Sequence, residues 1–228
     1  MSYDYTTFTA ALAVALAVDP AESRYLDLLP TIIDDAEQRC YRELDLVSAS
    51  VAVNGTMTAN NRYFTLPSSQ GHIIVVDAIN VFDDDNKRWP LKPATRDVID
   101  FCWPSDTAPS AVSIPSLFAR VDDTRVLVGC APGSPWNAEV VGTIRPFALS
   151  STNTSTFLTL YLSDLFFAAA MVSATGSLLK NFSAQADDPK MAVSWEGQFQ
   201  ARLASAKTEE LRKQYISANS TLPASVKA

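Results

Sequence analysis

The sequence has little of what most catalytic sites are built from. It contains a single histidine, His72, and its three cysteines form no CxxC pair. A serine or cysteine nucleophile usually needs a histidine beside it, and zinc or non-haem iron sites usually need several histidines or clustered cysteines. The seven glycines form no GxGxxG or Walker-type loop for nucleotide phosphates. The sequence therefore shows no visible active site, and we expect no cofactor and no bound metal.

Basic residues are also scarce. The chain has 18 Lys and Arg against 25 Asp and Glu, which gives a formal net charge of −7. It therefore lacks the basic surface of a dedicated duplex-binding protein. An acidic wall can still line a passage through which nucleic acid slides without sticking, because like charges repel.

Two further absences concern the compartment. Cys40, Cys102 and Cys130 are odd in number and far apart, so they predict buried free thiols in a reducing compartment. The apolar stretch at residues 10–18 has no positively charged region before it, so we expect no signal peptide.

One long apolar stretch is present, at residues 155–182. Its apolar side chains recur at steps of three and four on more than one side, which predicts a single helix with only a narrow polar strip at Thr159 and Ser163. Asp164 and Ser173 interrupt the run, so a buried helix covered by other helices is favoured over a membrane span. We expect Asp164 to point to a polar partner or to a neighbouring subunit.

Helices are predicted at both ends of the chain. Residues 5–18 form the first, a short helix starting at Asp19-Pro20 follows, and Pro30 restarts a helix with an apolar stripe. The last helix starts at a cap formed by residues 187–188 and ends near Tyr215. From the charges on the outer side of the Pro30 helix, we predict a solvated or subunit-interface face made of Arg39, Arg42 and Glu43.

The middle of the chain reads as strands, because the apolar period changes to two from residue 47. Asn54-Gly55 predicts a tight hairpin turn. Acidic turns are predicted at residues 83–87 and 122–124, where Asp is favoured for local hydrogen bonding. The expected strands are residues 47–53, 62–66, 72–82, 89–91, 117–121, 125–128 and 139–147.

Together these patterns predict an α+β fold, in which N- and C-terminal helices form a bundle and an antiparallel β-module is inserted. The expected parts are residues 1–46 and 150–216 for the bundle and residues 47–149 for the module. Residues 217–228, SANSTLPASVKA, form a polar tail that we expect to be disordered alone and to order on a partner.

Several stretches resemble one known family. Residues 29–46, LPTIIDDAEQRCYRELDL, contain a Leu-Pro, an apolar pair, an Ala-Glu and an Arg-Glu-Leu-Asp ending. Residues 51–67 contain a turn and a strand ending in Leu-Pro, and residues 76–91 a strand with an acidic turn and Pro-Leu. An apolar helix from Phe157 and an amphipathic helix from Met191 follow. This order resembles tailed-phage head-to-tail adaptor (connector) proteins, although residues 113–116, Ser-Ile-Pro-Ser, lack the Gly-Pro and Tyr expected there.

The resemblance implies a structural protein of the virion neck and no catalysis. It implies a homo-oligomeric, usually dodecameric, ring assembled in the host cytoplasm, with the portal protein on one side and a tail or nozzle protein on the other. Double-stranded DNA would pass through the ring without specific binding, and no membrane is involved. In this family the C-terminal segment often reaches toward the portal, which suggests portal contacts from Ser217, Leu222, Pro223, Val226 and Lys227.

Two other hypotheses stay open. The chain would be another ring component of the neck or tail, such as a tail terminator, although those proteins usually have a smaller and mostly β fold. Alternatively, it would be a hydrolase that uses His72 with a nearby serine. His72 starts an apolar strand, where an ordinary structural histidine is the simpler interpretation.

Overall fold

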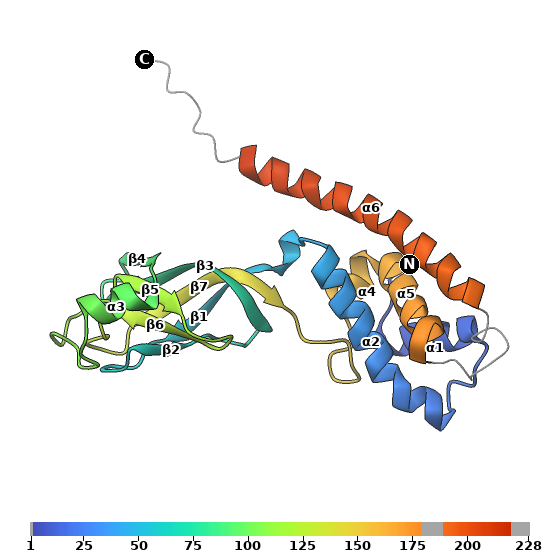
Figure 1. Cartoon of the computed structure of the whole chain (residues 1–228), viewed down its shortest axis with the longest axis horizontal. Helices are drawn as coiled ribbons and strands as arrows, with labels where there is room; N and C mark the ends of the chain where they lie inside the picture. The colour runs from blue at the N-terminus through green and yellow to red at the C-terminus, as the bar shows by residue number, and fades with distance from the viewer. Residues whose placement is uncertain (1, 179–188, 220–228) are drawn as a thin grey trace, which may run out of the picture. The chain divides into compact units, whose positions relative to one another are not determined.

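Two units make up the chain in the computed structural model, which describes residues 2–178 and 189–219. The helical unit comprises residues 1–48 and 147–228, and the β-module comprises residues 49–146 (Figure 1). Helices and a seven-stranded sheet are thus both present, which confirms the predicted α+β class.

The first helix, α1 (Tyr5–Leu16), has both of its ends determined by the local sequence. The Asp4 carboxylate accepts a hydrogen bond from the Thr7 N–H at 2.7 Å, and the Thr7 hydroxyl oxygen accepts one from the Asp4 N–H. This reciprocal cap satisfies donors that a helix start leaves unpaired. At the other end Ala17 is left-handed, with φ 56°, and stops the helix.

Helix α2 (Ser23–Glu43) contains Pro30 in its interior, so the predicted break and restart at this proline is wrong. A proline here removes the hydrogen bond to the Leu26 carbonyl, but Leu26 and Pro30 are both exposed, so water can satisfy that oxygen. The buried stripe continues on both sides of Pro30, from Tyr25 to Ile33. Burial of this continuous stripe keeps the helix in one piece.

The apolar stretch forms two helices, α4 (Phe157–Tyr161) and α5 (Ser163–Ser173), followed by a π-helical turn at Ala174–Leu178. The prediction of a single helix is wrong, because Leu162 has φ −123° and ψ 36°. Thr159 and Ser163, which mark the predicted polar strip, are both buried. Thr159 pairs with Thr156 in a capping box, so its burial leaves no lost hydrogen bond. Residues 179–182 lie outside the described residues.

Helix α5 is covered by other helices, as the sequence predicts. It packs against α1, α2 and α6 (Pro189–Asn219), and Figure 1 shows α1 and α2 beside it. The rings of Phe8 and Phe166 stack with centroids 4.6 Å apart, and the Tyr25 hydroxyl donates to the Thr9 carbonyl at 2.7 Å. Within the described residues, no helix combines the length and apolarity that crossing a bilayer requires.

The β-module is a sheet with strand order β1-β7-β3-β4-β5-β6-β2. Neighbouring strands are antiparallel except β4 and β5, so the sheet is mixed rather than antiparallel throughout as predicted. The chain between these two strands is long enough to return to the same end because it includes helix α3 (Arg96–Cys102). The strands are β1 (Ser50–Thr56), β2 (Tyr63–Thr65), β3 (His72–Phe82), β4 (Arg88–Pro93), β5 (Leu117–Arg120), β6 (Arg125–Gly129) and β7 (Asn137–Arg145).

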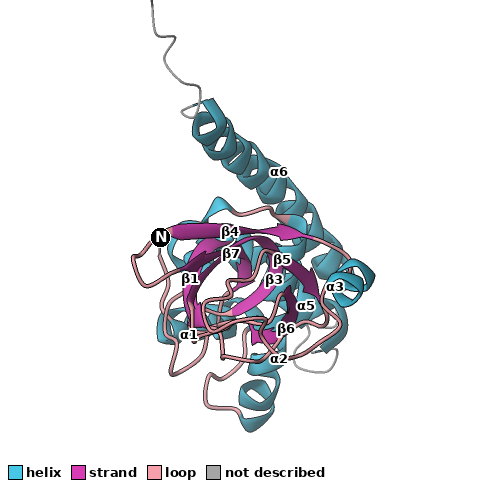
Figure 2. Cartoon of the chain, turned by 90° about the vertical axis from the view of Figure 1, so that its left-hand side faces the viewer, coloured by secondary structure: helices cyan, strands magenta, loops and turns pink. Residues whose placement is uncertain are grey.

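The sheet curls strongly (Figure 2), and its two edge strands, β1 and β2, approach each other at Gly55 and Phe64. A Cβ atom placed on Gly55 of β1 would lie 3.1 Å from the ring of Phe64 on β2. Asn54 and Gly55 pair with Glu139 and Ala138 of β7, so they are strand residues. The predicted hairpin turn at this dipeptide is wrong. The interior of the curl is filled by a core that includes Met57, Phe64, Ile79, Val81, Val126, Val128, Trp136 and Val140.

Strand β3 has the predicted bounds but also two register shifts against β7 that the sequence does not announce. At this irregular stretch a Cβ on Gly142 would lie 2.1 Å from the Val75 carbonyl oxygen, so only glycine fits. The Arg120 guanidinium donates to the carbonyl of Ile73 at 3.2 Å and to that of Ile74. This side chain therefore binds carbonyls of the shifted segment.

Both acidic turns have the predicted local role. The Asp83 carboxylate accepts from the Lys87 N–H and from the Trp89 indole, each at 2.8 Å. The Asp122 carboxylate accepts from the Thr124 N–H at 2.8 Å and from the Arg125 side chain at 2.9 Å. These bonds, led by the Thr124 N–H, lower the pKa of Asp122 to about 2.

Candidate interaction sites

Of the three predicted interface residues, Arg39 lies where α2 meets α6. Arg39 makes a two-pronged ion pair with Glu196 of α6, at 2.6 and 2.7 Å, and also bonds Glu43 at 3.0 Å. Its guanidinium lies 4.0 Å from the centre of the Phe199 ring. Bonding to Glu196 raises the pKa of Arg39 and lowers the pKa of Glu196. Arg39 thus joins two helices of its own chain, and Glu43 bonds Arg39 from within α2.

Arg42 differs from these two residues. It is exposed and donates to Gln38 one turn earlier on the same helix. A subunit-interface role for Arg39, Arg42 and Glu43 stays a prediction, and only Arg42 has its charge away from the α2–α6 contact.

Two buried carboxylates, missed by sequence reasoning, hold the chain where it leaves and re-enters the helical unit. Glu37 of α2 accepts from the Leu149 N–H at 3.1 Å, and Glu210 of α6 accepts from the Val47 N–H at 3.0 Å. The two residues are only 4% and 3% exposed. Each lies at a position of its helix's apolar stripe, four residues after Ile33 and Ala206 respectively, which is the sequence signal that identifies them.

The two carboxylates have different surroundings. Burial is the main cause that raises the pKa of Glu37 to about 7, helped by the nearby Asp34, while the Leu149 N–H opposes the rise. Glu210 instead bonds the Lys213 ammonium at 2.6 Å. Glu37 is therefore a buried acid that titrates near neutral pH.

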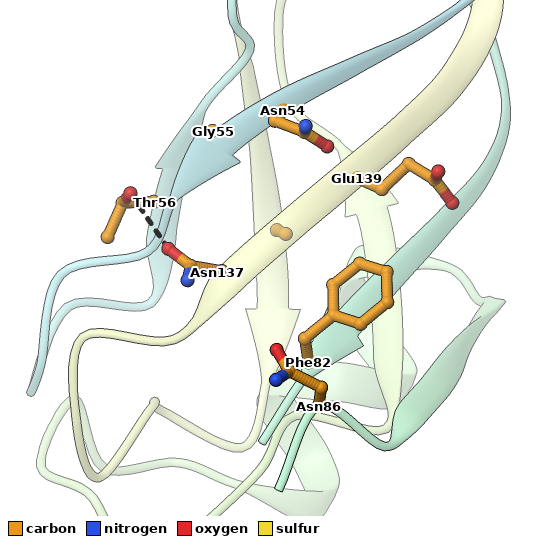
Figure 3. A pocket seen from close by; sticks show the side chains of 8 residues that line it. Asn54, Gly55, Thr56, Phe82, Asn86, Asn137 and Glu139 are labelled. Carbon is orange, nitrogen blue, oxygen red and sulfur yellow. Dashed lines mark hydrogen bonds between the residues drawn. The ribbon is translucent and has the colours of Figure 1, made fainter. Parts of the chain in front are cut away.

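A cavity of about 530 Å³ lies on the β-module, lined by side chains from β1, β3 and β7 and from the turn after β3 (Figure 3). Its polar residues are Asn54, Thr56, Asn86, Asn137 and Glu139, and Phe82 supplies an aromatic ring. This group is not predicted from the sequence, because Asn54-Gly55 has the local pattern of a hairpin turn.

Bonds within the cavity fix its side chains. The Thr56 hydroxyl donates to the Asn137 side-chain oxygen at 3.4 Å. Glu139 accepts from the Asn80 amide at 2.9 Å and forms an ion pair with Arg88 at 3.1 Å. The Arg88 guanidinium also lies 5.5 Å from the centre of the Phe82 ring.

His72, the residue considered for catalysis, is not among the residues that line this cavity. His72 is the exposed first residue of β3, opposite Arg145 of β7. Among the residues that the structure describes, no three His, Cys, Asp or Glu side chains are placed to share a metal ion. Cys40 is buried, which raises the pKa of its thiol to about 12, whereas Cys130 is half-buried and Cys102 is exposed. All three cysteines are free thiols, as predicted, but the predicted burial holds only for Cys40 and is wrong for Cys102 and Cys130.

Asp164 has the polar partner that the sequence predicts. Arg202 of α6 donates to its backbone carbonyl at 2.8 Å, and the two side chains lie 3.8 Å apart. Helix α6 extends to Asn219, four residues beyond the predicted end, so Ser217 is helical rather than part of a tail. Leu222, Pro223, Val226 and Lys227 lie outside the described residues, as do Asp187 and Asp188 of the predicted cap.

Comparison with known protein families gives a match over nearly the whole chain. The sequence matches the family described as SU10 adaptor protein, over residues 3–222. A search of curated proteins found no match.

Proposed function

The chain belongs to the SU10 adaptor protein family, a family of structural phage adaptors, and from this premise we propose that it is a head-to-tail adaptor. In this proposal, copies of the chain form a ring beneath the portal of a tailed phage. The ring extends the DNA channel and presents the surface to which the tail attaches. The family match over residues 3–222 carries the proposal, because it spans both the helical unit and the β-module.

The chain's charge supports passage of DNA through such a ring. With a net charge of −7, an acidic channel would repel the phosphate backbone and so avoid gripping it. The proposed partners are the portal protein, a tail or nozzle protein and further copies of the chain, in a dodecamer. A ring needs two different surfaces on each subunit, and we propose Arg42 and its neighbours as part of one of them.

Two alternatives predict different behaviour. A tail terminator would bind the end of a tail tube rather than a portal. A hydrolase that uses His72 would lose its activity in the variant His72→Ala, whereas an adaptor would assemble normally with that change. His72 is the exposed first residue of β3, opposite Arg145 of β7, a position that suits an ordinary surface histidine.

The direct test is to mix the purified full chain with purified portal and to image the mixture by electron microscopy. We expect dodecameric rings on one end of the portal. A chain that stays monomeric and ignores the portal would contradict the proposal. If it binds an isolated tail tube instead, the tail-terminator alternative replaces the adaptor.

A second test concerns the C-terminal segment. Truncation after Asn219 removes Leu222, Pro223, Val226 and Lys227 and leaves helix α6 complete. We expect this truncation to abolish binding to the portal, and a chain ending in a Gly-Ser segment of equal length controls for bulk. Unchanged assembly of the truncated chain would show that the segment does not contact the portal.

A further inference from the structure

The cavity on the β-module is built from two rows of side chains on one face of the sheet. The strand register places Asn54, Glu139 and Asn80 side by side in one row. Thr56, Asn137 and Phe82 form the second row, again one residue from each of β1, β7 and β3. Because successive side chains alternate between the faces of a strand, both rows point away from the core. The register of the sheet thus arranges these side chains in two regular rows.

Its polar groups are those that recognise neutral, hydroxyl-rich molecules. Each of the amides of Asn54, Asn86 and Asn137 offers both donors and an acceptor. The Thr56 hydroxyl already donates to the oxygen of Asn137, which directs the Asn137 NH₂ group toward other acceptors. Glu139 adds carboxylate oxygens that accept from hydroxyl groups.

The charges in the cavity cancel. The carboxylate of Glu139 lies 3.1 Å from Arg88 and also accepts from the buried Asn80 amide. The other lining residues are uncharged. The balance favours a neutral ligand over a metal cation or a phosphate.

Phe82 supplies the apolar part of the site. Figure 3 shows its ring between Glu139 and Asn86, with Thr56 and Asn137 on the other side of the cavity. An aromatic ring packs well against the C–H face of a sugar, while the hydroxyl groups of the sugar bond to surrounding amides and carboxylates. A volume of about 530 Å³ is also in the range of small-molecule sites.

We propose that this cavity binds a neutral sugar unit of a glycan, which Phe82 stacks against and the amides of Asn54, Asn86 and Asn137 hold by its hydroxyl groups. An extended peptide fits less well, since added strands pair along a free edge and this cavity lies on the face of β1, β7 and β3. The inference goes beyond the adaptor function and does not rest on it.

The test uses the isotope-labelled full chain and four neutral probes: glucose, galactose, mannose and N-acetylglucosamine. We expect at least one of them to cause saturable shifts in the side-chain amide resonances of the three asparagines. Asn137→Ala and Phe82→Ala should each weaken this binding about tenfold, which corresponds to about 1.4 kcal/mol. Asn54→Ala is the third variant, because Asn54 is exposed and its loss should not disturb folding.

Matched controls come from the same face of the same strands. Ser50 and Thr143 are register partners on β1 and β7, and neither lines the cavity. Ser50→Ala and Thr143→Ala should therefore leave sugar binding unchanged. The proposal is overturned if no probe gives saturable shifts at tens of millimolar, or if the cavity variants bind as well as the controls. Tighter binding of glucuronate than of glucose would overturn the neutral-ligand assignment.

Discussion

Two buried acids bind the chain at the points where it leaves the helical unit for the β-module and where it returns. Glu37 and Glu210 each occupy a position in a buried apolar stripe. The carboxylate of each accepts a hydrogen bond from one backbone N–H. A buried N–H without a partner is destabilising, so each acid satisfies a donor that a hydrocarbon side chain would leave unpaired. The two acids differ in their surroundings, since Glu210 has Lys213 beside it, whereas burial and, to a smaller extent, Asp34 raise the pKa of Glu37.

The pKa of Glu37 predicts how stability changes with pH. In the folded chain this pKa is about 7, against an ordinary value of 4.5, so the folded state holds the proton more tightly than the unfolded state. The stabilisation is complete below about pH 4.5 and is lost as the pH rises through 7. We expect Glu37→Gln to unfold like the wild type at pH 5 and to be more stable at pH 8, by about 2 kcal/mol.

Urea unfolding followed by far-ultraviolet circular dichroism, which reports mainly on helices, measures this difference. Glu22→Gln is the control, because Glu22 is exposed and its side chain makes no cap bond at the start of the same helix. Parallel pH profiles for the wild type and Glu37→Gln would show that the buried acid does not titrate near neutral pH.

At the scale of elements, the α2–α6 contact depends on the fork of Arg39. Two parallel bonds to Glu196 give more energy than a single surface ion pair, and the Phe199 ring beneath adds packing. A double-mutant cycle with Arg39→Met and Glu196→Gln should give a coupling free energy of about 1 kcal/mol, discounted because both side chains are about one-third exposed. Arg39→Lys should recover less than half of it, because an ammonium cannot form the fork.

The same cycle on Lys213 and Glu209 is the control, since this pair lies one turn apart within α6. Such helical pairs contribute about 0.3 kcal/mol. Urea unfolding of the four variants of each cycle gives both coupling energies. If the Arg39–Glu196 coupling is no larger than that of the control, the contact does not hold α6 to α2.

Element by element, the sequence predicted what local patterns determine. Alternation located β3 and β7, and Asp-rich turns located the hairpins at Asp83 and Asp122. The failures at Pro30 and Gly55 share a cause, which is that tertiary packing outweighed a local signal. Buried side chains on both sides of Pro30 keep α2 whole, and the Phe64 ring needs the space that Gly55 leaves on a strand.

The candidate sites were harder to predict than the elements. Glu37 and Glu210 are recognisable as acids at stripe positions, but their N–H partners come from residues more than a hundred positions away. The cavity on the β-module depends on the register of β1, β7 and β3, which sets Asn54 beside Glu139. Pairing register between strands distant in sequence is decided by the folded sheet and not by the local pattern.

At the scale of the whole molecule, the β-module is an insertion between the two parts of the helical unit, and such an insertion can be removed. Ser50 and Thr143 are paired on neighbouring antiparallel strands, so the β-module begins and ends at one place. Paired residues in such strands lie about 5 Å apart, and a short linker spans this distance at little entropic cost. Each unit also has buried residues of its own, around Phe166 in the helical unit and around Ile79 in the β-module.

We therefore predict that residues 49–146 fold alone, and that residues 1–48 and 147–228 fold when a short Gly-Ser linker joins them. The Glu37–Leu149 and Glu210–Val47 bonds should persist in the linked helical polypeptide, because all four residues belong to the helical unit. Dispersed amide spectra and cooperative thermal unfolding of both chains are the expected results. If residues 49–146 alone stay unfolded while the linked helical polypeptide folds, the β-module needs the helical unit to fold. If the linked helical polypeptide stays unfolded instead, the helical unit needs the β-module.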